Sequence, residues 1–194
     1  MNIIKMGKLT KMEKDYLFGI FIGDGYKNYD KKQRHYTIEF YLHSERDLDI
    51  QKYLIYILQK IGLCVFVMKD KRFKCSRIKT HSKQLFRLLD EFNVTNADLG
   101  LGFIAGLVDA EGHVDHQKSF INVVNTDKSL LGVAAFILKD INIETKIRQR
   151  VKSRKDRKNS YILSIPYKIK DIRTNSIKIN SGKTSKHSGN CLSK

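Results

Sequence analysis

Two copies of one short motif decide the fold of this chain: Leu17-Phe18-Gly19-Ile20-Phe21-Ile22-Gly23-Asp24-Gly25 and Ile104-Ala105-Gly106-Leu107-Val108-Asp109-Ala110-Glu111-Gly112. Each copy is an apolar run that ends in an acidic residue followed by glycine. That acid is Asp24 in the first copy and Glu111 in the second. A weaker echo follows each copy, in residues 58–63 and 138–143. An internal repeat of this kind predicts two similar halves that form a pseudo-symmetric pair.

Small residues recur at every fourth position in both copies, so they share one helix face. They are Gly19 and Gly23 in the first half and Gly102, Gly106 and Ala110 in the second. A face of small residues lets two backbones approach closely, and each apolar run is only about half of a membrane span. We therefore expect two helices packed face to face, one from each half. Both should end just before Gly25 and Gly112, which suit left-handed caps.

The sequence around each motif predicts the same order of helices and strands in both halves. Thr10 and Glu13 have the spacing of a capping box before the first motif, and Thr95 or Asn96 could cap the second. Apolar spacing and alternation define the remaining elements. The predicted helices are 48–61, 82–92 and 130–141, and the predicted strands are 36–43, 65–68, 73–80, 145–151 and 161–165.

The two halves, predicted as residues 10–95 and 96–172, end differently. The first closes with the apolar-spaced helix 82–92, whereas the matching stretch 167–172 stops early. Residues 173–194 hold five basic and no acidic residues among serine, asparagine, glycine and threonine. Such a composition predicts a disordered basic tail.

Composition and charge narrow the class of protein. The 194 residues are 41% hydrophobic, which excludes a wholly disordered chain. Three cysteines without a CxxC pair argue against a disulfide scaffold and a zinc finger. Without a signal-peptide pattern or a membrane span, we expect a cytoplasmic or organellar protein that is not secreted. The net charge of +17 predicts a polyanionic partner, most simply nucleic acid.

Asp24 and Glu111 should lie side by side at the C-terminal ends of the two packed helices. Each carboxylate then faces the negative end of a helix dipole, and the two carboxylates repel each other. A bound divalent cation removes both costs, and hard oxygen ligands suit Mg²⁺, for which Mn²⁺ can substitute. An ordinary polar cap would explain one such acid. Two acids at the same register of a repeat favour metal-assisted hydrolysis of a phosphodiester.

The two motifs resemble those of the LAGLIDADG homing endonucleases of the single-chain, two-motif kind, over residues 16–172. The second motif fits closely; the first has Ile22 and Gly23 where the family pattern has aspartate and alanine. The resemblance implies an α+β fold, with two pseudo-symmetric αββαββα halves forming a β-sheet saddle around two central packed motif helices. It also implies a monomer on a long, asymmetric double-stranded DNA target.

The resemblance assigns the catalytic and metal-binding acids to Asp24 and Glu111. It places Gly23 and Ala110, the residues just before them, in the metal site as well. Asp109, at the motif's first acidic position, is usually structural in this family. His43 and Asn125 lie at similar places in the two halves, where polar residues of the family order water around the metals. An exposed polar residue at a strand end explains them equally well.

Basic residues alternate along one predicted strand of the second half. Lys146, Arg148, Arg150, Lys152 and Arg154 would share one face, where five like charges repel strongly without a polyanion. DNA contact is therefore favoured over a merely solvated face. The other predicted DNA-binding residues are Asn28, Lys31, Lys32, Arg34, Glu39, Tyr41, His43, Lys69, Lys71, Arg72, Lys74, Arg77, Lys79 and Asn125.

Taken together, these features predict an intron- or intergenic-encoded DNA endonuclease. Two alternatives stay open. One is a maturase, in which the same basic saddle binds intron RNA and aids splicing. The other is a DNA-binding relative that has lost catalysis, against which the presence of both acids argues.

Overall fold

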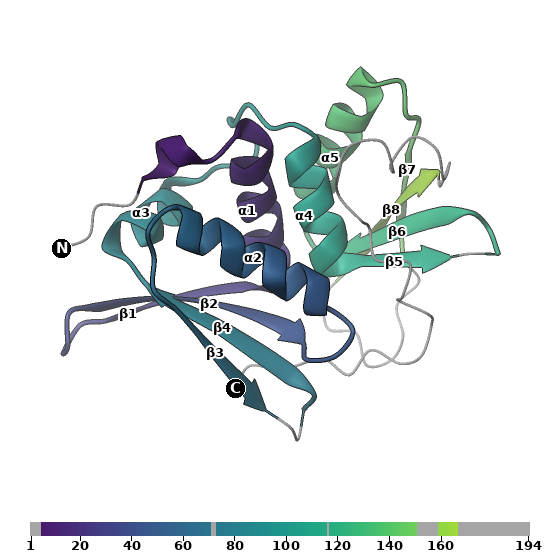
Figure 1. Cartoon of the computed structure of the whole chain (residues 1–194). Helices are drawn as coiled ribbons and strands as arrows, with labels where there is room; N and C mark the ends of the chain where they lie inside the picture. The colour runs from purple at the N-terminus through teal and green to yellow at the C-terminus, as the bar shows by residue number, and fades with distance from the viewer. Residues whose placement is uncertain (1–4, 71–72, 116, 151–158, 167–194) are drawn as a thin grey trace.

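The computed structural model describes residues 5–70, 73–115, 117–150 and 159–166, which form two similar halves (Figure 1). After a short 3-10 turn, η1 (Met6–Lys8), the first half consists of α1 (Lys11–Asp24), β1 (Gly25–Asp30), β2 (His35–His43), α2 (Leu48–Lys60), β3 (Val65–Asp70), β4 (Cys75–His81) and α3 (Lys83–Glu91). The second half consists of α4 (Leu101–Glu111), β5 (Gly112–Asp115), β6 (Phe120–Asn125), α5 (Lys128–Asp140), β7 (Lys146–Gln149) and β8 (Tyr161–Pro166).

Each half contains one four-stranded antiparallel sheet with the same topology. The strand order is β1-β2-β4-β3 in sheet A of the first half and β5-β6-β8-β7 in sheet B of the second. The helices lie on one side of the sheets, and α1 and α4 run side by side at the centre (Figure 1). The predicted α+β class, with paired sheets and two central motif helices, is confirmed.

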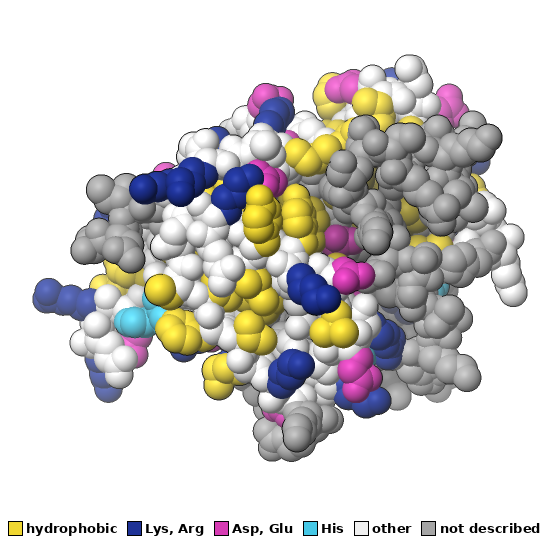
Figure 2. Space-filling view, viewed as in Figure 1, with side chains coloured by type: hydrophobic (Ala, Val, Ile, Leu, Met, Phe, Trp, Pro, Cys, Tyr) yellow, Lys and Arg dark blue, Asp and Glu magenta, His cyan; other side chains and the backbone are white. Residues whose placement is uncertain are grey.

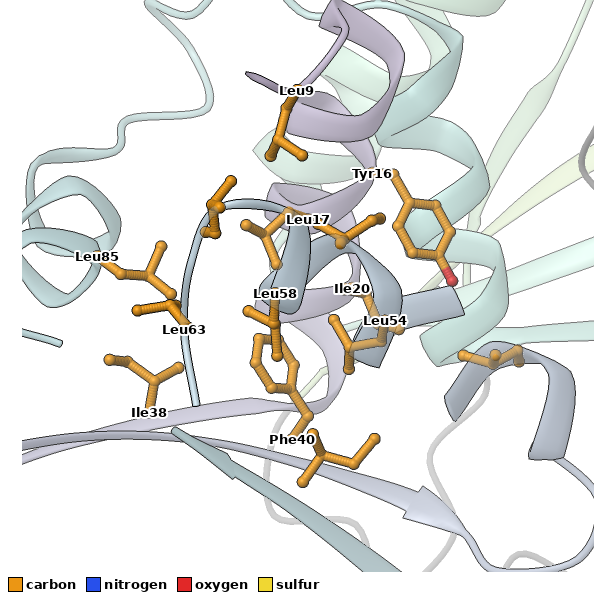
Figure 3. Packing of buried hydrophobic residues seen from close by; sticks show 14 of the residues in the cluster. Leu9, Tyr16, Leu17, Ile20, Ile38, Phe40, Leu54, Leu58, Leu63 and Leu85 are labelled. Atoms are coloured by element: carbon orange, nitrogen blue, oxygen red, sulfur yellow. The ribbon is translucent and has the colours of Figure 1, made fainter. Parts of the chain in front are cut away.

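A hydrophobic core fills each half between its sheet and its helices. In the first half, Phe40 from β2 points toward Leu58 from α2 and Leu17 from α1, all fully buried (Figure 3). In the second half, Phe103 and Leu107 of α4 belong to a separate hydrophobic cluster, together with buried residues of β5, β6 and β8. In the part of the chain that the structure describes, no helix is long and apolar enough to cross a membrane.

The two motif helices pack through their small residues, as the spacing of four residues predicts. A Cβ atom on Gly19 would collide with the carbonyl oxygen of Phe103 and lie 2.8 Å from the backbone nitrogen of Leu107. A Cβ on Gly106 would meet α1 in the same way, 2.7 Å from the nitrogen of Ile20. Backbone therefore lies directly against backbone along this seam. The side chains of Phe18 and Ile22 on α1 cross it and pack against the core of the second half.

The start of α1 follows the prediction, and the start of α4 does not. Thr10 and Glu13 form the full capping box. The helix α4 begins later than Thr95 or Asn96 would place it, with Gly100 as its N-cap. The backbone N–H of Gly100 donates a hydrogen bond of 2.8 Å to the carboxylate of Asp15. The cap comes from the partner helix α1, so no local sequence pattern reports it.

The glycines that end both motif helices also differ from the prediction. Gly25 has φ −90° and Gly112 has φ −78°, so both are extended and neither is a left-handed cap. Each is glycine because the chain turns tightly over the last helical turn. A Cβ atom would collide with the carbonyl oxygen of Phe21 at Gly25 and of Val108 at Gly112.

The structure describes the helix that closes the first half. The helix α3 covers sheet A, with Leu85 and Leu89 in its core. The early stop at 167–172 and the predicted disordered tail 173–194 lie outside the described residues, as does any last helix of the second half. The boundaries between the halves stay predictions.

Candidate functional site

The two motif acids lie at neighbouring helix ends. Asp24 is the last residue of α1 and Glu111 the last residue of α4, and both are half-buried. Close packing reaches this end of the seam, because a Cβ atom on Gly23 would collide with Ala110 and lie 3.0 Å from the Cγ atom of Glu111. The repeat therefore places two carboxyl groups where the C-terminal ends of two helices meet, which is unfavourable without a counter-charge.

The donor set at these helix ends fits a hard divalent cation. Among the described residues, no group of three or more His, Cys, Asp or Glu side chains could hold a metal ion. A cation held by Asp24 and Glu111 would therefore take its other ligands from backbone carbonyls, water or phosphate. Mg²⁺ and Mn²⁺ suit this arrangement because they prefer oxygen ligands and Mg²⁺ usually retains several waters. A structural zinc ion would need four protein ligands.

Asp109 has a structural position in the seam. Asp109 is buried, and the Tyr16 hydroxyl donates a hydrogen bond of 2.9 Å to its Oδ2 atom. Burial, and then the charge of Asp109, raise the pKa of Tyr16 far above its usual value. The phenol therefore stays protonated and ties α1 to α4. This position agrees with a structural role for the first acid of the motif.

Sheet A gathers several of the predicted DNA-binding residues on its outer face, away from the core. Ile38, Phe40 and Leu42 point inward, so Glu39 and Tyr41 point outward. The register with β1 and β4 puts Asn28, Arg77 and Lys79 on that same face.

Glu39 is the centre of this outer group and is only 6% exposed. The Tyr41 hydroxyl donates a hydrogen bond of 2.5 Å to it. Arg77 and Lys79 approach its two carboxylate oxygens at 3.8 and 3.9 Å. Burial, and then the Glu39 hydrogen bond, raise the pKa of Tyr41. The carboxylate thus holds two cations and one phenol in fixed positions, which sequence alternation alone does not reveal.

Other basic residues of the first half lie elsewhere. Lys69 pairs with Ser76, next to Arg77, so its side chain is on the opposite face of sheet A. The sequence grouped Lys69 with Arg77 and Lys79 as DNA-binding residues, but Lys69 does not share their face. Lys71 and Arg72 lie outside the described residues. The other four basic residues are exposed in the β1–β2 and β3–β4 turns. The four are Lys31, Lys32, Arg34 and Lys74.

Sheet B keeps part of the predicted basic row. Lys146 and Arg148 are exposed and share the outer face, whereas Ile147 between them pairs with the buried Leu163. The strand β7 ends at Gln149, although the backbone N–H of Arg150 still donates to the carbonyl of Ser160 at 2.8 Å. Lys152 and Arg154 lie outside the described residues.

His43 and Asn125 occupy equivalent turns in the two halves. The His43 Nδ1 atom accepts hydrogen bonds from the backbone N–H groups of Glu45 and Arg46, at 3.2 and 3.1 Å. The Asn125 side-chain oxygen accepts one from the N–H of Asp127 at 2.8 Å. Both side chains therefore stabilise the turn from strand to helix. This arrangement supports the strand-end interpretation for both residues.

A histidine pair on sheet A is absent from the predicted set. His35 Nε2 and His81 Nδ1 lie 2.6 Å apart on the outer face. They are 46 residues apart in the chain, because His35 begins β2 and His81 ends β4. The sequence therefore carries no signal for the pair before the strands are registered.

Comparisons with known proteins agree with this architecture. Residues 98–182 match the family model of the LAGLIDADG-like domain. No curated protein sequence gives a significant match. The fold is similar to that of I-DmoI solved in complex with DNA and calcium, with a TM-score of 0.60, 22% identity, and coverage of 80% of this chain and 83% of that chain. Other structures of I-DmoI, a homing endonuclease, include a complex with DNA and manganese.

The fold also occurs in a differently named protein. The N-terminal LAGLIDADG domain of DUF199/WhiA matches with a TM-score of 0.56 and 18% identity, over 89% of this chain and 85% of that chain. Full-length DUF199/WhiA from Thermatoga maritima matches with a TM-score of 0.53 and 20% identity, over 84% of this chain and 52% of that chain. With both motifs on helices packed at its centre, the chain has the fold of I-DmoI, and its second half matches the LAGLIDADG-like domain.

Proposed function

We propose that this protein is a site-specific DNA endonuclease of the homing type. It hydrolyses phosphodiester bonds in a long, asymmetric double-stranded target with a divalent metal, Mg²⁺ or Mn²⁺. The observation that carries the proposal is the meeting of Asp24 and Glu111 at the ends of two helices in backbone contact. A fold that served only to bind DNA would gain nothing from two carboxylates at this point of a chain with a net charge of +17.

The proposed roles follow from the positions of the residues. Asp24 and Glu111 hold the metal, with Gly23 and Ala110 beside them. When bound, the metal polarises the scissile phosphate and activates water. The outer faces of sheets A and B carry the DNA, through Arg77 and Lys79 in one half and through Lys146 and Arg148 in the other. Two unlike halves suit an asymmetric target read by one chain.

Likeness to I-DmoI, a homing endonuclease, supports this proposal, while the same fold in DUF199/WhiA comes with no activity in its name. The carboxylate pair is therefore the feature to test. Cleaved sites should first be selected from a random or genomic DNA library in Mg²⁺. The selected site then serves as substrate for Asp24→Asn and Glu111→Gln, which keep the side-chain shapes and remove the charges.

We expect each variant to lose cleavage and to keep most of its affinity for the site. Glu45→Gln, which removes an exposed carboxylate in the turn before α2, is the matched control and should cleave normally. Full double-strand cutting by both motif variants would exclude the assigned acids. Recovery of no cleaved site from the library, with DNA binding intact, would favour the inactive DNA-binding relative. Intron splicing by the doubly substituted protein would instead favour the maturase.

A further inference from the structure

Charge on the outer face of sheet A is lower than the net charge of the chain suggests. The four strands place Arg77 and Lys79 on this face, together with three carboxylates, Asp30, Glu39 and Asp70. Figure 2 shows the helix-covered face of the same half, where lysine and arginine side chains lie among hydrophobic and acidic ones. A duplex along sheet A would therefore need further positive charge from groups that can gain it.

The histidine pair lies where such charge is available. His35 and His81 line a cavity of about 310 Å³ at the end of sheet A, between the β1–β2 hairpin, the start of β3 and the start of α3. Its other cationic side chains are Arg34 and Lys83, and none of the residues that line it is Asp or Glu. Ser82 and Gln84 add polar side chains. The lining is thus suited to an anion.

The contact between the two rings limits their protonation. At 2.6 Å, one of the two facing nitrogens donates and the other accepts. The Thr37 hydroxyl lies 3.3 Å from the same nitrogen of His81. Two imidazolium rings would direct N–H groups at each other, so the second proton cannot bind while the pair stays closed. An oxyanion between the rings would accept from both and remove this conflict.

We propose that His35 and His81 bind a backbone phosphate of duplex DNA in this cavity, and that the bound phosphate replaces the hydrogen bond between the two rings. This inference rests on the proposed DNA-binding function of sheet A. Because the phosphate favours protonated rings, binding takes up a proton. Affinity for DNA then rises as pH falls toward and below about 6.5, the usual pKa of histidine.

The groups around the pair agree with this direction. Burial, and then His35 and Lys79, lower the pKa of His81 in the free protein. The charged neighbours are Asp30 on β1, Arg34 and Glu39 around β2, Lys79 on β4 and Lys83 on α3, while β3 contributes the apolar ring of Phe66. Asp30 already accepts hydrogen bonds from the N–H groups of Lys32 and Gln33. Negative charge from DNA would therefore oppose the factors that lower the pKa of His81.

The test measures binding of the full chain to a random-sequence duplex without divalent metal, from pH 7.5 to 5.5 at constant ionic strength. Uptake of one proton gives up to about a tenfold gain in affinity per pH unit. We expect His35→Gln combined with His81→Gln to flatten this dependence. Lys139→Ala, which removes an exposed lysine from the last turn of α5, should keep it. An unchanged dependence in the double variant, or its loss in Lys139→Ala, would overturn the proposal.

Histidine ring signals in NMR identify the ligand. Duplex DNA should shift the ring signals of the pair toward the imidazolium form, relative to the free protein at the same pH. Inorganic phosphate at the same phosphate concentration should have little effect. Saturation by inorganic phosphate alone would overturn the assignment to the DNA backbone and leave a site for a free anion. No shift with either would overturn the site.

The two proposals fail in different ways. If Mg²⁺-dependent cleavage occurs but DNA binding is independent of the histidine pair, only the phosphate contact is wrong. If binding depends on the pair but no site is ever cleaved, the phosphate contact stands and the endonuclease does not.

Discussion

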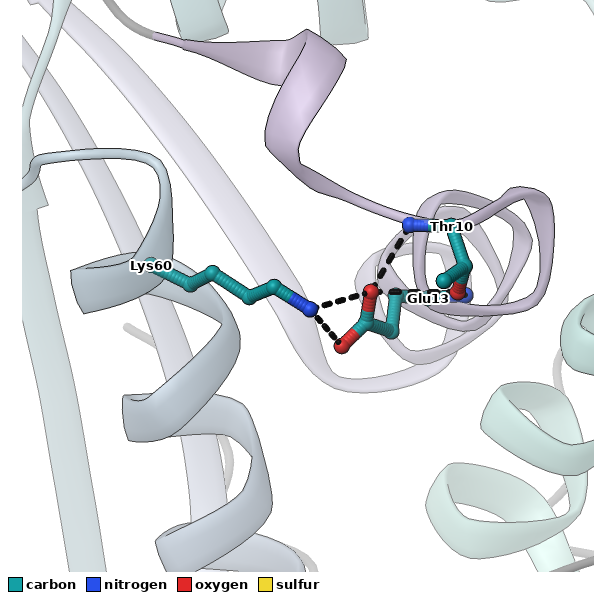
Figure 4. A network of polar contacts seen from close by, with 3 residues as sticks. All are labelled: Thr10, Glu13 and Lys60. Atoms are coloured by element: carbon teal, nitrogen blue, oxygen red, sulfur yellow. Dashed lines mark hydrogen bonds and ion pairs between the residues drawn. The ribbon is translucent and has the colours of Figure 1, made fainter.

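Glu13 shows how one side chain joins two helices of the first half. Its carboxylate accepts hydrogen bonds from the Thr10 backbone and hydroxyl at 2.8 and 3.0 Å, and pairs with the Lys60 ammonium at 2.7 Å (Figure 4). Burial alone would raise the pKa of Glu13, but the hydrogen bonds from Lys60 and Thr10 outweigh burial and lower it. The capping box was visible in the sequence, whereas the bond to Lys60 at the end of α2 depends on tertiary packing.

The lowered pKa of Glu13 predicts a pH-dependent contribution to stability. A group with a depressed pKa in the folded state stabilises the fold above its unfolded pKa, about 4.3 for glutamate, and less as pH falls through the folded value. Glu13→Gln should lower the free energy of unfolding at pH 7 by about 1 kcal/mol, typical of a lost cap. Denaturant unfolding of both proteins from pH 7 to 3 should show the gap closing below pH 4.3, and a constant gap would contradict the prediction. Glu45→Gln serves as an exposed control.

At the scale of elements, the seam between α1 and α4 determines where the motif acids lie. The glycines of this seam face backbone atoms of the other helix, which cannot rotate away from an added methyl group. Because the seam runs to Gly23 and Ala110, any separation of the helices would also separate Asp24 from Glu111. Stability and the candidate metal site therefore depend on the same small residues.

Two glycine-to-alanine substitutions in helices should therefore change the free energy of unfolding in opposite directions. In Gly106→Ala the new Cβ would lie 2.7 Å from the nitrogen of Ile20, so we expect a loss of about 1–3 kcal/mol, as for other overpacked cores. Gly132 lies inside α5 with nothing within 4 Å of the added Cβ. Gly132→Ala should therefore raise stability by about 0.5–1 kcal/mol. Chemical denaturation measures both, and stabilisation by Gly106→Ala would exclude the close seam.

For the whole molecule, the sequence predicted what local periodicity and the repeat can encode. The motif helices, their end points and the inward face of β2 follow from spacing. Features that depend on how distant segments meet did not follow. Asp15 caps α4 from the other half, and Lys69 changes face across a hairpin. The extended glycines after the motifs are explained by collisions with the preceding helical turn, which residue type alone does not distinguish from a left-handed cap.

The outer faces of both sheets should bind DNA as one surface, and salt dependence tests this at the level of the molecule. Each phosphate contact that is lost lowers the slope of log K against log salt by about 0.9. Lys146→Ala and Arg148→Ala, on sheet B, should each lower the slope by this amount for any duplex, because backbone contacts carry no sequence information. Lys139→Ala is the matched control, since it removes an exposed lysine from the last turn of α5. If the three variants give equal slopes, the outer face of sheet B does not contact DNA. If only the sheet B variants change the slope, and equally for specific and random duplexes, Lys146 and Arg148 bind DNA through its charged backbone. Selection of the sequence then depends on other side chains, such as Glu39 and Tyr41 on sheet A.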